Sequence, residues 1–574
     1  GQIFDIQIKE FDSKNGKKLK IVKIYITDYE TSVICKKLYN YDDKILYNTG
    51  DYVIVNGTYK CDDKYSKECF IDLKTIKKVD IKPYELVDNA IQKRVELSIK
   101  TNMSELSSNI NAKKINTIIR DLGYSAYAVN DLGVVHSFPF LYDKKDDSVK
   151  AILGLEAYVV DDNAKLVVNP TDELLDRATY VVFDIETTGL NPYSDKIIEI
   201  GAIKVKSNKI IDEFSVFINP QIPIPKEITE LTSITDEDVK DARTIDLVLP
   251  EFIEFSKNCI LVAHNANFDV GFITEKSKQL KIETNFSYID TIQWAKLTLP
   301  GQKRFNLDAL CKKFDIVNEH HHRAINDAKV TAQIFRKLLS LIMGMNVNTL
   351  TDVNEKLQLD IKIAPTQKTT ILIRNQTGLK TIYELVSKSL VEYYGNGKPR
   401  IPKSLLEKNR ENILISSSPT IGFNDSGELV SMYIRGIDKD EIEESAKFYD
   451  YIQIMPISCY EADIKMKEIT DENYVIEMNK YFYELGEKLG KKVVAVGNVM
   501  YMYEYERKAK SVLQLANKEF KSFKYPTNNY FRTTEMMLDE FSYFPQKIRE
   551  DIVIKNTNDI ADMIDRVRPI PEGF

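Results

Sequence analysis

The sequence has no long apolar run, no closely spaced pair of cysteines and no excess of positive charge. No stretch approaches the roughly 18 apolar residues of a membrane-spanning helix, and the N-terminus lacks the architecture of a signal peptide. The six cysteines form no C-x-x-C pair, which argues against a zinc site and predicts reduced, structural thiols. These absences predict a cytoplasmic globular protein with no membrane partner.

The charge also limits the function classes that remain. The formal net charge is −7, so any binding of nucleic acid must depend on local patches or on bound metal. Internal repeats and low-complexity tracts are missing. A chain of 574 residues is long enough for about four domains of ~150 residues each.

The hydrophobic pattern predicts a multidomain chain that starts with an all-β block. Residues 1–81 contain short extended runs such as "KLKIVKIYITD" and "ECFIDLKTIKKV", and Asn56-Gly57 is typical of a hairpin turn. Several short strands in this length favour a small barrel, for which an OB-fold is one candidate. Mixed strands and helices follow over 88–175, and residues 178–345 alternate regularly between strand and helix.

Two carboxylates interrupt the most strand-like segment of the chain. The sequence "YVVFDIETTGL" at 180–190 places Asp184 and Glu186 two residues apart, so in a strand both side chains leave the same face. Two like charges in a partly buried place repel one another unless a cation compensates them. This spacing therefore indicates a bound cation.

Further acidic residues and a histidine follow in the same block. Asp269 stands in "AHNANFDVGF" at the start of a predicted helix, and His322 and Asp327 stand in "HHHRAIND" at the entrance to another. Four carboxylates with hard oxygen ligands suit Mg²⁺ or Mn²⁺. Two such ions, ~3.5–4 Å apart, are the usual device for phosphodiester displacement, and a histidine can take the proton of the attacking water.

These motifs resemble the DEDD exonuclease superfamily, in the branch whose third motif is His-x-x-x-x-Asp. The resemblance implies a ribonuclease H-like fold and metal-dependent 3′→5′ removal of nucleotides. By the same resemblance, His322 is the general base. The implied metal ligands are Asp184, Glu186, Asp269 and Asp327. The residues implied near the terminal nucleotide are Thr187, Leu190, His264, Asn265 and Phe268. Two alternatives stay open here, because Phe268 is also suited to the core and His264 to a helix cap.

The resemblance extends along the whole chain to PolC-type DNA polymerase III alpha subunits of low-GC Gram-positive bacteria. It is carried by "KRVELSIKT", "GLEAYVVDD", "KPRIPKSLLEK", "FYDYIQIMP", "VVAVGNVMY" and "YFRTTEMMLDEFSYF". In that family the exonuclease is inserted into a PHP (polymerase and histidinol phosphatase) domain. The resemblance thus implies PHP halves at 88–175 and 366–528 around an exonuclease at 178–345. The resemblance also implies that residues 529–574 are a helical segment leading to a polymerase module, which we expect to be missing from this chain. The implied partners are a DNA primer 3′ end and the replisome with its sliding clamp.

The PHP metal motifs of the family are altered in this sequence. The family's His-x-His-Thr strand corresponds here to Ser98-Ile99-Lys100-Thr101, and its Thr-Asp-His motif corresponds to Asn130-Asp131-Leu132. The last histidine of its Gly-Asn-Val-His motif is replaced by Met500. Asp131 and Glu156 then remain as isolated carboxylates. We expect no metal in the PHP domain, because an ammonium at a ligand position repels a divalent ion.

Two other functions are compatible with these motifs. A non-catalytic DNA-binding or assembly module would use the barrel and the PHP shell, although the complete carboxylate set argues against this as a full explanation. An RNA-trimming exonuclease would use the same five residues, and only the flanking domains favour DNA.

Overall fold

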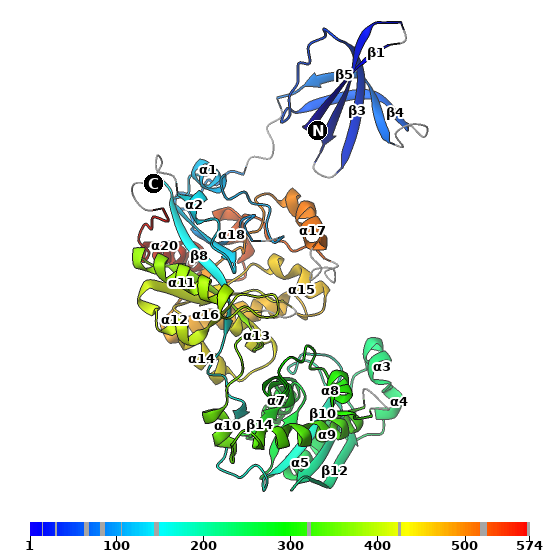
Figure 1. Ribbon diagram of the computed structural model, residues 1–574, viewed down its shortest axis with the longest axis vertical. Coiled ribbons are helices and arrows are strands. Elements are labelled where there is room, and N and C mark those ends of the chain that lie inside the picture. Colours follow the sequence, from blue (N-terminus) through cyan, green and yellow to red (C-terminus); the bar gives the residue numbers. More distant parts are fainter. Residues whose placement is uncertain are drawn as a thin grey trace.

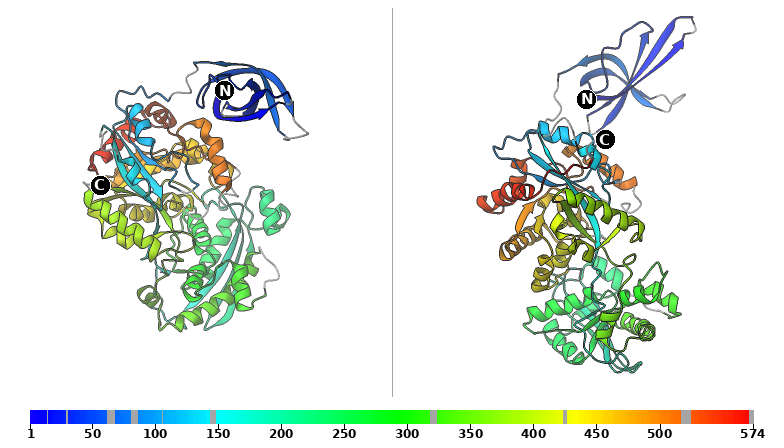
Figure 2. Two further views of the ribbon diagram at one scale, coloured as in Figure 1. Left: turned by 45° about the horizontal axis from the view of Figure 1, so that its top comes forward. Right: turned by 60° about the vertical axis from the view of Figure 1, so that its left-hand side comes forward.

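The computed structural model describes residues 1–570, except 14, 29–30, 62–67, 81–85, 105, 143–147, 318–322, 423–425 and 517–524. It contains an N-terminal barrel, a middle unit (residues 166–357), and a flanking domain built from residues on both sides of the middle unit. The barrel lies at one end of the molecule and the middle unit at the other, with the flanking domain between them (Figures 1 and 2). Among the described residues, no helix combines the length and the apolar character that crossing a membrane requires.

The N-terminal barrel is all-β, as predicted. Its sheet has the order β1-β2-β3-β5-β4, in which β3 and β5 run parallel and the other neighbours antiparallel. A bridge between Gln2 and Tyr52 brings the start of β1 to the start of β4. Residues such as Val22, Ile24 and Cys35 fill the interior. The strands are β1 (Gln2–Asp12), β2 (Lys18–Thr27), β3 (Ser32–Asn40), β4 (Val53–Cys61) and β5 (Cys69–Lys78).

Two predictions for the barrel were wrong. Asn56 and Gly57 form no hairpin turn but lie inside β4, where the register with β5 shifts at a β-bulge. Gly57 approaches the Asp72 backbone so closely that a side chain would collide with it. Cys61 and Cys69 are register partners of β4 and β5 and form a disulfide, with Cα atoms 4.0 Å apart, so these two are not reduced thiols.

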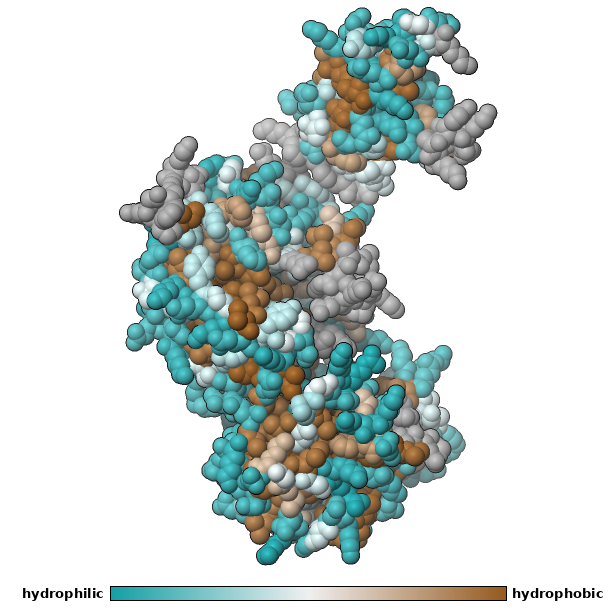
Figure 3. Space-filling view, in the orientation of Figure 1, coloured by the Kyte–Doolittle hydropathy of each residue, from teal (hydrophilic) through white to brown (hydrophobic). Residues whose placement is uncertain are grey.

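The surface of the barrel carries several exposed apolar side chains. Phe4, Ile8, Leu38, Ile54 and Tyr59 are each at least 47% exposed, and Figure 3 shows hydrophobic areas on the visible face of the barrel. Lysines lie among these side chains: Lys36 Nζ stands 4.1 Å from the centre of the Phe70 ring, and Lys23 pairs with Glu68 at 2.8 Å. The outer surface is therefore mixed, with neither a purely apolar nor a purely basic face.

The flanking domain has one sheet whose strands come from both sides of the middle unit. Its order is β17-β15-β8-β7-β6, and β16 pairs with another stretch of β8. Strand β8 thus contacts β7 before the middle unit and β15 after it. The early strands are β6 (Glu96–Ile99), β7 (Ala126–Leu132) and β8 (Lys150–Val160), and the late ones are β15 (Gln367–Ile373), β16 (Arg400–Pro402) and β17 (Ile413–Ser417).

Helices surround this sheet and share its core. A further parallel pair, β18 (Tyr451–Ile454) and β19 (Lys492–Ala495), lies among them. The earlier helices are α1 (Ile115–Asp121), α2 (Phe138–Leu141), α11 (Gln376–Val391), α12 (Lys403–Glu407), α13 (Glu428–Ile434) and α14 (Lys439–Lys447). The later helices are α15 (Glu461–Lys465), α16 (Glu472–Leu489) and α17 (Arg507–Ala516).

The C-terminal segment is helical, as predicted, but it is more than a connection to another module. Helices α18 (Thr534–Glu540) and α20 (Asn556–Asp562) bury apolar side chains in the same core as the flanking-domain sheet, and Ile548 of α19 (Gln546–Glu550) packs against that core. Phe531, Phe541 and Ile552 are each fully buried there. The last described part of the chain is therefore integral to the flanking domain.

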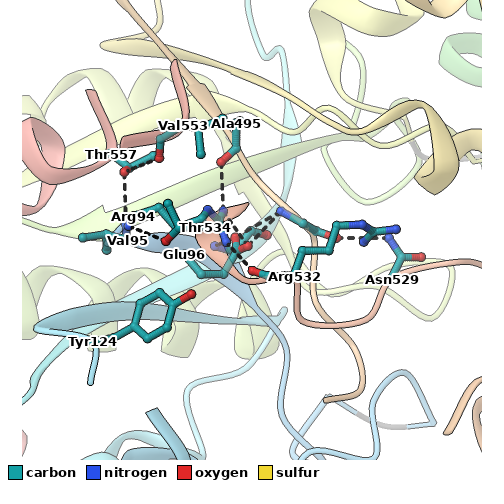
Figure 4. A network of polar contacts seen from close by, with 12 residues as sticks. Arg94, Val95, Glu96, Tyr124, Ala495, Asn529, Arg532, Thr534, Val553 and Thr557 are labelled. Atoms are coloured by element: carbon teal, nitrogen blue, oxygen red, sulfur yellow. Dashed lines mark hydrogen bonds and ion pairs between the residues drawn. The ribbon is translucent and has the colours of Figure 1, made fainter. Parts of the chain in front are cut away.

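A buried polar network joins this C-terminal segment to strand β6 (Figure 4). Arg94 Nη2 donates to Glu96 Oε2 at 2.8 Å and to the Ala495 carbonyl at 3.1 Å, and the Arg94 and Glu96 side chains are fully buried. Glu96 also accepts bonds from the backbone N–H groups of Ser98 and Gly497. The network connects residues that lie about 400 positions apart in the sequence.

The middle unit has a mixed sheet covered by helices on both faces. Its order is β12-β11-β10-β13-β14-β9, with β10, β13 and β14 parallel. Alternate residues of β10 enter different cores: Tyr180 and Val182 pack on one side, Val181 and Phe183 on the other. The strands are β9 (Val167–Val168), β10 (Thr179–Thr187), β11 (Ile197–Lys206), β12 (Lys209–Phe217), β13 (Ile260–Ala263) and β14 (Tyr288–Asp290).

The helices of the middle unit follow the predicted alternation. The sequence "AINDAKVTAQIFRKLLSLI" forms the longest of them, α9 (Ala324–Met343), which packs on β10 and β11. The others are α3 (Lys226–Thr232), α4 (Asp236–Val239), α5 (Ile245–Phe255), α6 (Ala266–Gln279), α7 (Thr291–Thr298), α8 (Leu307–Phe314) and α10 (Leu350–Lys356).

The middle unit extends beyond the predicted limits of 178–345 at both ends. Strand β9, expected in the block at 88–175, pairs with β14, and the Trp294 indole N–H donates to the Leu166 carbonyl at 3.1 Å. Leu350 and Val353 of α10 are buried in the same core. The segments that contain β9 and α10 are short and carry few apolar residues. The sequence pattern alone therefore could not assign these segments to the middle unit or to the flanking domain.

Candidate active site

Three carboxylates converge at the end of β10 in the middle unit. Asp184 and Glu186 come from β10, and Asp327 comes from the first turn of α9, which lies on the same face of the sheet. One oxygen from each side chain lies within 4.8 Å of the others. The strand spacing thus places the first two acids together as predicted, and the packing of α9 adds the third.

Asp269 lies beside this cluster but is not part of the group whose oxygens lie within 4.8 Å of one another. It is buried in the first turn of α6, and its Oδ1 accepts a hydrogen bond from the backbone N–H of Ile185 at 3.2 Å. Its charge nevertheless acts on Asp184 and raises the pKa of that group. All four predicted acidic residues therefore surround the end of one strand.

The arrangement raises the pKa values of Asp184, Glu186 and Asp269. Burial, followed by the charges of Asp269, Glu186 and Asp327, holds the pKa of Asp184 well above its usual value. Burial and the neighbouring Asp327 raise the pKa of Glu186 to about 8. Hard oxygen ligands that repel one another in this way suit a divalent cation such as Mg²⁺ or Mn²⁺.

These shifts predict how the stability of the middle unit depends on pH. Without metal, the folded chain keeps the Glu186 proton up to a pH of about 8, whereas the unfolded chain loses it near 4.5. Since the folded state then binds more protons, the free energy of unfolding should fall as pH rises between these values. We expect Mn²⁺ to reduce this fall, because it stabilises the ionised carboxylates.

The single tryptophan makes this prediction measurable in the full chain. Trp294 is fully buried in the middle unit, so its fluorescence during urea unfolding reports on that unit alone. Curves at several pH values should be compared in EDTA and in Mn²⁺, with Glu186→Gln as the control that should reduce the dependence. A stability that rises with pH in EDTA would contradict the assignment.

Three residues that the sequence did not single out position α9 against the sheet. Glu199 in β11 is 1% exposed and accepts hydrogen bonds from the Arg323 guanidinium and from the backbone N–H of Ala324, each at 3.1 Å. Gly201, the register partner of Asp184, lies under the first turn of α9. A Cβ atom there would collide with the backbone of Ala324 and Ile325. Asp327 can therefore approach Asp184 only because residue 201 is glycine.

For the exonuclease that the family resemblance implies, Gly201→Ala is expected to lower the rate of digestion about a hundredfold, because it would displace Asp327 by a fraction of an ångström to an ångström. The measurement is the rate of DNA digestion at saturating Mn²⁺. Gly271→Ala is the matched control, since the nearest atom to a Cβ at that position of α6 is 3.5 Å away. Equal rates for the two variants would show that this close approach does not matter.

The predicted general base and the predicted nucleotide-binding residues differ in how exposed they are and in what they contact. His322 lies outside the described residues. His264 Nδ1 lies 2.9 Å from the Thr291 hydroxyl, and burial lowers the pKa of His264 to about 4, so its ring is neutral at pH 7. Leu190 is 75% exposed, whereas Phe268 packs partly on the core with its ring 5.0 Å from that of Phe272.

Two further predicted residues, Thr187 and Asn265, lie where the chain leaves β10 and where it enters α6. The Thr187 hydroxyl donates to the Gly189 carbonyl at 2.5 Å, directly after the β10 acids. Asn265 is exposed at the start of α6, and its backbone N–H donates to Asp290 Oδ1 at 3.2 Å. Asp290 also caps α7, so the sequence motif around Asn265 is tied to the neighbouring strand β14.

A second polar group lies in the flanking domain, at the positions of the altered metal motifs. Asp131 and Glu156, the carboxylates left over from those motifs, both have polar partners. Asp131 accepts bonds from the Thr101 backbone N–H at 2.7 Å and from the Ser104 hydroxyl at 2.8 Å. Lys100 Nζ lies 3.4 Å from Glu156 Oε2. An ammonium thus occupies the place beside the carboxylate.

Two family models match the chain. The Exonuclease model covers residues 181–335, which include all the acidic residues of the middle-unit site. The PHP domain model covers residues 317–479, which overlap the end of the first match and include β15 to β18. The chain therefore contains an exonuclease domain and a PHP domain.

Full-length similarity comes from curated relatives named DNA polymerase III PolC-type. The chain is 38% identical to the protein of Caldanaerobacter subterraneus and 37% identical to that of Clostridium perfringens, in both cases over 100% of its length. It is 36% identical to the Thermotoga petrophila protein over 99% of its length. The chain spans about 40% of the length of these relatives.

Two solved structures are also similar to part of the chain. Exonuclease X in complex with 5′ overhanging duplex DNA is 28% identical with a TM-score of 0.24, over 28% of this chain and 91% of that one. The nuclease domain of 3′hExo, a DEDDh family member bound to rAMP, is 19% identical with a TM-score of 0.27, over 29% of this chain and 92% of that one.

Proposed function

We propose, from its full-length similarity to PolC-type DNA polymerase III, that this chain is the proofreading part of a replicative polymerase. It is a metal-dependent 3′→5′ exonuclease that hydrolyses the terminal phosphodiester of a DNA primer. The observation that carries the proposal is the convergence of Asp184, Glu186 and Asp327 within 4.8 Å, beside Asp269. Carboxylates gathered this closely are suited to binding two divalent ions, and the raised pKa values of Asp184 and Glu186 show how strongly the group lacks a compensating charge.

The four acidic residues would hold Mg²⁺ or Mn²⁺ in this site. When bound, the two ions supply Lewis-acid stabilisation of the attacking water and of the leaving 3′ oxygen. His322 takes the proton of the attacking water as general base. Thr187, Leu190, His264, Asn265 and Phe268 hold the terminal nucleotide. In this role His264 acts as a neutral group, because its pKa lies near 4.

The flanking domain is proposed to be a PHP domain divided in sequence by the exonuclease. The support is the single sheet in which β8 pairs with both β7 and β15. We propose that this domain binds no catalytic metal, because its donor set does not fit one. Lys100 stands beside Glu156, and Ser98, Leu132 and Met500 offer no imidazole.

The remaining parts of the proposal concern the barrel and the partners. The strand order of the barrel and the Gln2–Tyr52 bridge support an OB-like barrel. The chain works in the cytoplasm at a primer 3′ end that is single-stranded or frayed. Its partners are the polymerase module of the same enzyme, the sliding clamp and the replisome.

The proposal predicts a clear order of substrates. With Mn²⁺ or Mg²⁺, the chain should shorten 5′-labelled single-stranded DNA and a primer with a mispaired 3′ end, one nucleotide at a time. A fully paired primer should be digested more slowly, because its end must first fray. EDTA should abolish digestion.

Two outcomes of the same gel would contradict the proposal. Faster digestion of a single-stranded RNA of the same sequence would favour an RNA-trimming enzyme. DNA binding without digestion at any concentration of either metal would favour a non-catalytic assembly module.

A further inference from the structure

The loop that follows the two acids of β10 is closed at its base by a pair of hydrogen bonds. It spans residues 188–196 and leads from β10 into β11. The Thr188 backbone N–H donates to the Lys196 carbonyl at 2.8 Å, and the Lys196 backbone N–H donates to the Thr188 hydroxyl at 2.9 Å. The β10–β11 loop contains Leu190 and directly follows Thr187, both proposed to face the terminal nucleotide. The way in which its outer part is held therefore affects how these two residues meet a substrate.

A buried lysine holds the outer part of this loop against α6. Lys276 is 3% exposed, and its Nζ donates to the Pro192 carbonyl at 2.6 Å. Burial lowers the pKa of Lys276 to about 8, so the group is still mostly protonated at pH 7 and donates as a cation. Because α6 also carries Asp269, the loop and this acid of the site have a common support.

The flanking domain contacts the same residue of the loop. Helices α13 and α14 lie on the side of that domain that faces the middle unit (Figure 1), and Gly436 is in the turn between them. Gly436 has a φ of +68°, and a Cβ atom there would lie 2.6 Å from Pro192 Cγ and 3.5 Å from Tyr193 Cδ2. Ordinary contacts between carbon atoms are about 3.5–4.0 Å. The turn therefore approaches the loop as closely as a residue without a side chain allows.

An ion pair next to this turn joins the flanking domain to α6. Lys278 Nζ lies 3.0 Å from Asp438 Oδ2, and Asp438 also caps α14. Both charged side chains are at least 36% exposed, so the pair itself contributes little free energy. It nevertheless connects the turn to the helix that holds the loop. We call the meeting of Pro192, Lys276 and Gly436 the docking contact.

We propose that the flanking domain positions the β10–β11 loop through the docking contact, so that nuclease turnover depends on how the two units dock. Gly436 and Pro192 are positioning residues, because they act on the terminal nucleotide only through the loop. Asp184 and Glu186 precede the loop on β10. Displacing the loop should therefore impair placement of the terminal nucleotide and leave metal binding unchanged. This inference rests on the proposed exonuclease function, and one of its two readouts does not require nuclease activity.

The main variant is Gly436→Ala in the full chain, because its new Cβ would meet Pro192 and force the turn or the loop to move by about 1 Å. Gly490→Ala is the matched control. Gly490 also lies in the flanking domain with a positive φ of 64°, but nothing lies within 4 Å of a Cβ at that position. Both variants thus carry a similar backbone strain, and only Gly436→Ala touches the loop.

The first readout is hydrogen exchange of the backbone amides of residues 188–196, followed by mass spectrometry without DNA or metal. We expect exchange in this loop to be at least about tenfold faster in Gly436→Ala than in Gly490→Ala, because the displaced loop opens more often. Equal exchange in the two variants would overturn the proposal, whether the chain digests DNA or not.

The second readout is the steady-state digestion of a mispaired primer. Relative to Gly490→Ala, Gly436→Ala should lower kcat/KM about tenfold and leave the half-saturating concentration of Mn²⁺ unchanged. Pro192→Ala removes the Cγ atom that the new Cβ would meet, so it should raise the rate of Gly436→Ala and not that of Gly490→Ala.

Three results of the digestion assay would count against parts of this picture. An unchanged kcat/KM in Gly436→Ala, or the same effect of Pro192→Ala in both variants, would overturn the positioning role of the docking contact. A higher requirement for Mn²⁺ in Gly436→Ala would overturn the separation of nucleotide placement from metal binding. If the unchanged chain digested no DNA, the proposed function would fail, whereas the exchange measurement would still decide whether the flanking domain holds the loop.

Discussion

Replacing Asp184 and Glu186 together by alanine is expected to lower the rate of DNA digestion by at least about a thousandfold. Both side chains leave the same face of β10, and with Asp327 they form the only three-ligand group among the described residues. Without them, Asp327 and Asp269 are too few ligands to hold two ions. The measurement is the single-turnover rate on a mispaired primer with saturating Mn²⁺.

The double variant should at the same time be more stable than the unchanged chain in EDTA. Burial and mutual repulsion raise the pKa values of both acids, so the folded state carries them at a cost. Trp294 fluorescence should therefore show a higher urea midpoint in EDTA and a smaller stabilisation by Mn²⁺. Slower digestion together with unchanged or higher stability would show that the variant has lost the site and kept the fold.

Asp212→Ala is the matched control, because Asp212 is an exposed carboxylate on β12 of the same sheet. It should leave both digestion and the response to Mn²⁺ unchanged. If the Asp184→Ala, Glu186→Ala chain digested DNA at the rate of this control, the site would have to be sought elsewhere.

Arg94→Met is expected to destabilise the flanking domain by about 3–5 kcal/mol, the usual cost of breaking a fully buried ion pair by removing one partner. Glu96 would remain buried with only the backbone N–H groups of Ser98 and Gly497 to stabilise its charge. The Ala495 carbonyl would also lose its donor. The network in Figure 4 would thus lose the bond from Arg94 to Ala495 at the end of β19.

Urea unfolding followed by far-UV circular dichroism should show the loss as an earlier transition. The Trp294 signal and the exonuclease rate should change little, because the middle unit has cores of its own. Arg120→Met is the control, since Arg120 pairs with Asp121 on the surface, where such pairs contribute only about 0–1 kcal/mol. Similar midpoints for the two variants would contradict a structural role for the network.

The sequence predicted the parts of the site that depend on local spacing. Asp184 and Glu186 share a face because strand residues alternate, and Asp327 lies in the first turn of a helix whose apolar period was visible. The sequence did not predict the roles of Glu199 and Gly201. Their roles depend on how α9 lies across β11, and only the acid and the glycine within "KIIEIGAIKVK" hinted at them.

The errors in the fold also arose from tertiary contacts. Asn56-Gly57 has the composition of a hairpin turn, but the pairing of β4 with β5 continues through it and turns it into a bulge. Cys61 and Cys69 are eight residues apart, and only the register of those strands brings their sulfur atoms together. No local pattern could show that β8 and β15 are neighbours; the family resemblance suggested it.

The shared sheet of the flanking domain has a consequence for synthesis on the ribosome. Strand β8 ends at Val160, and its partner β15 begins only at Gln367. At ~5–20 residues per second, β8 lacks that partner for on the order of 10–40 s, so the backbone N–H and C=O groups along one of its edges stay unpaired. The middle unit, which is complete by Lys356, can fold in the meantime. The nascent chain can therefore carry a folded middle unit beside an unfinished sheet, and during this interval the unpaired edge of β8 is open to pairing with other chains.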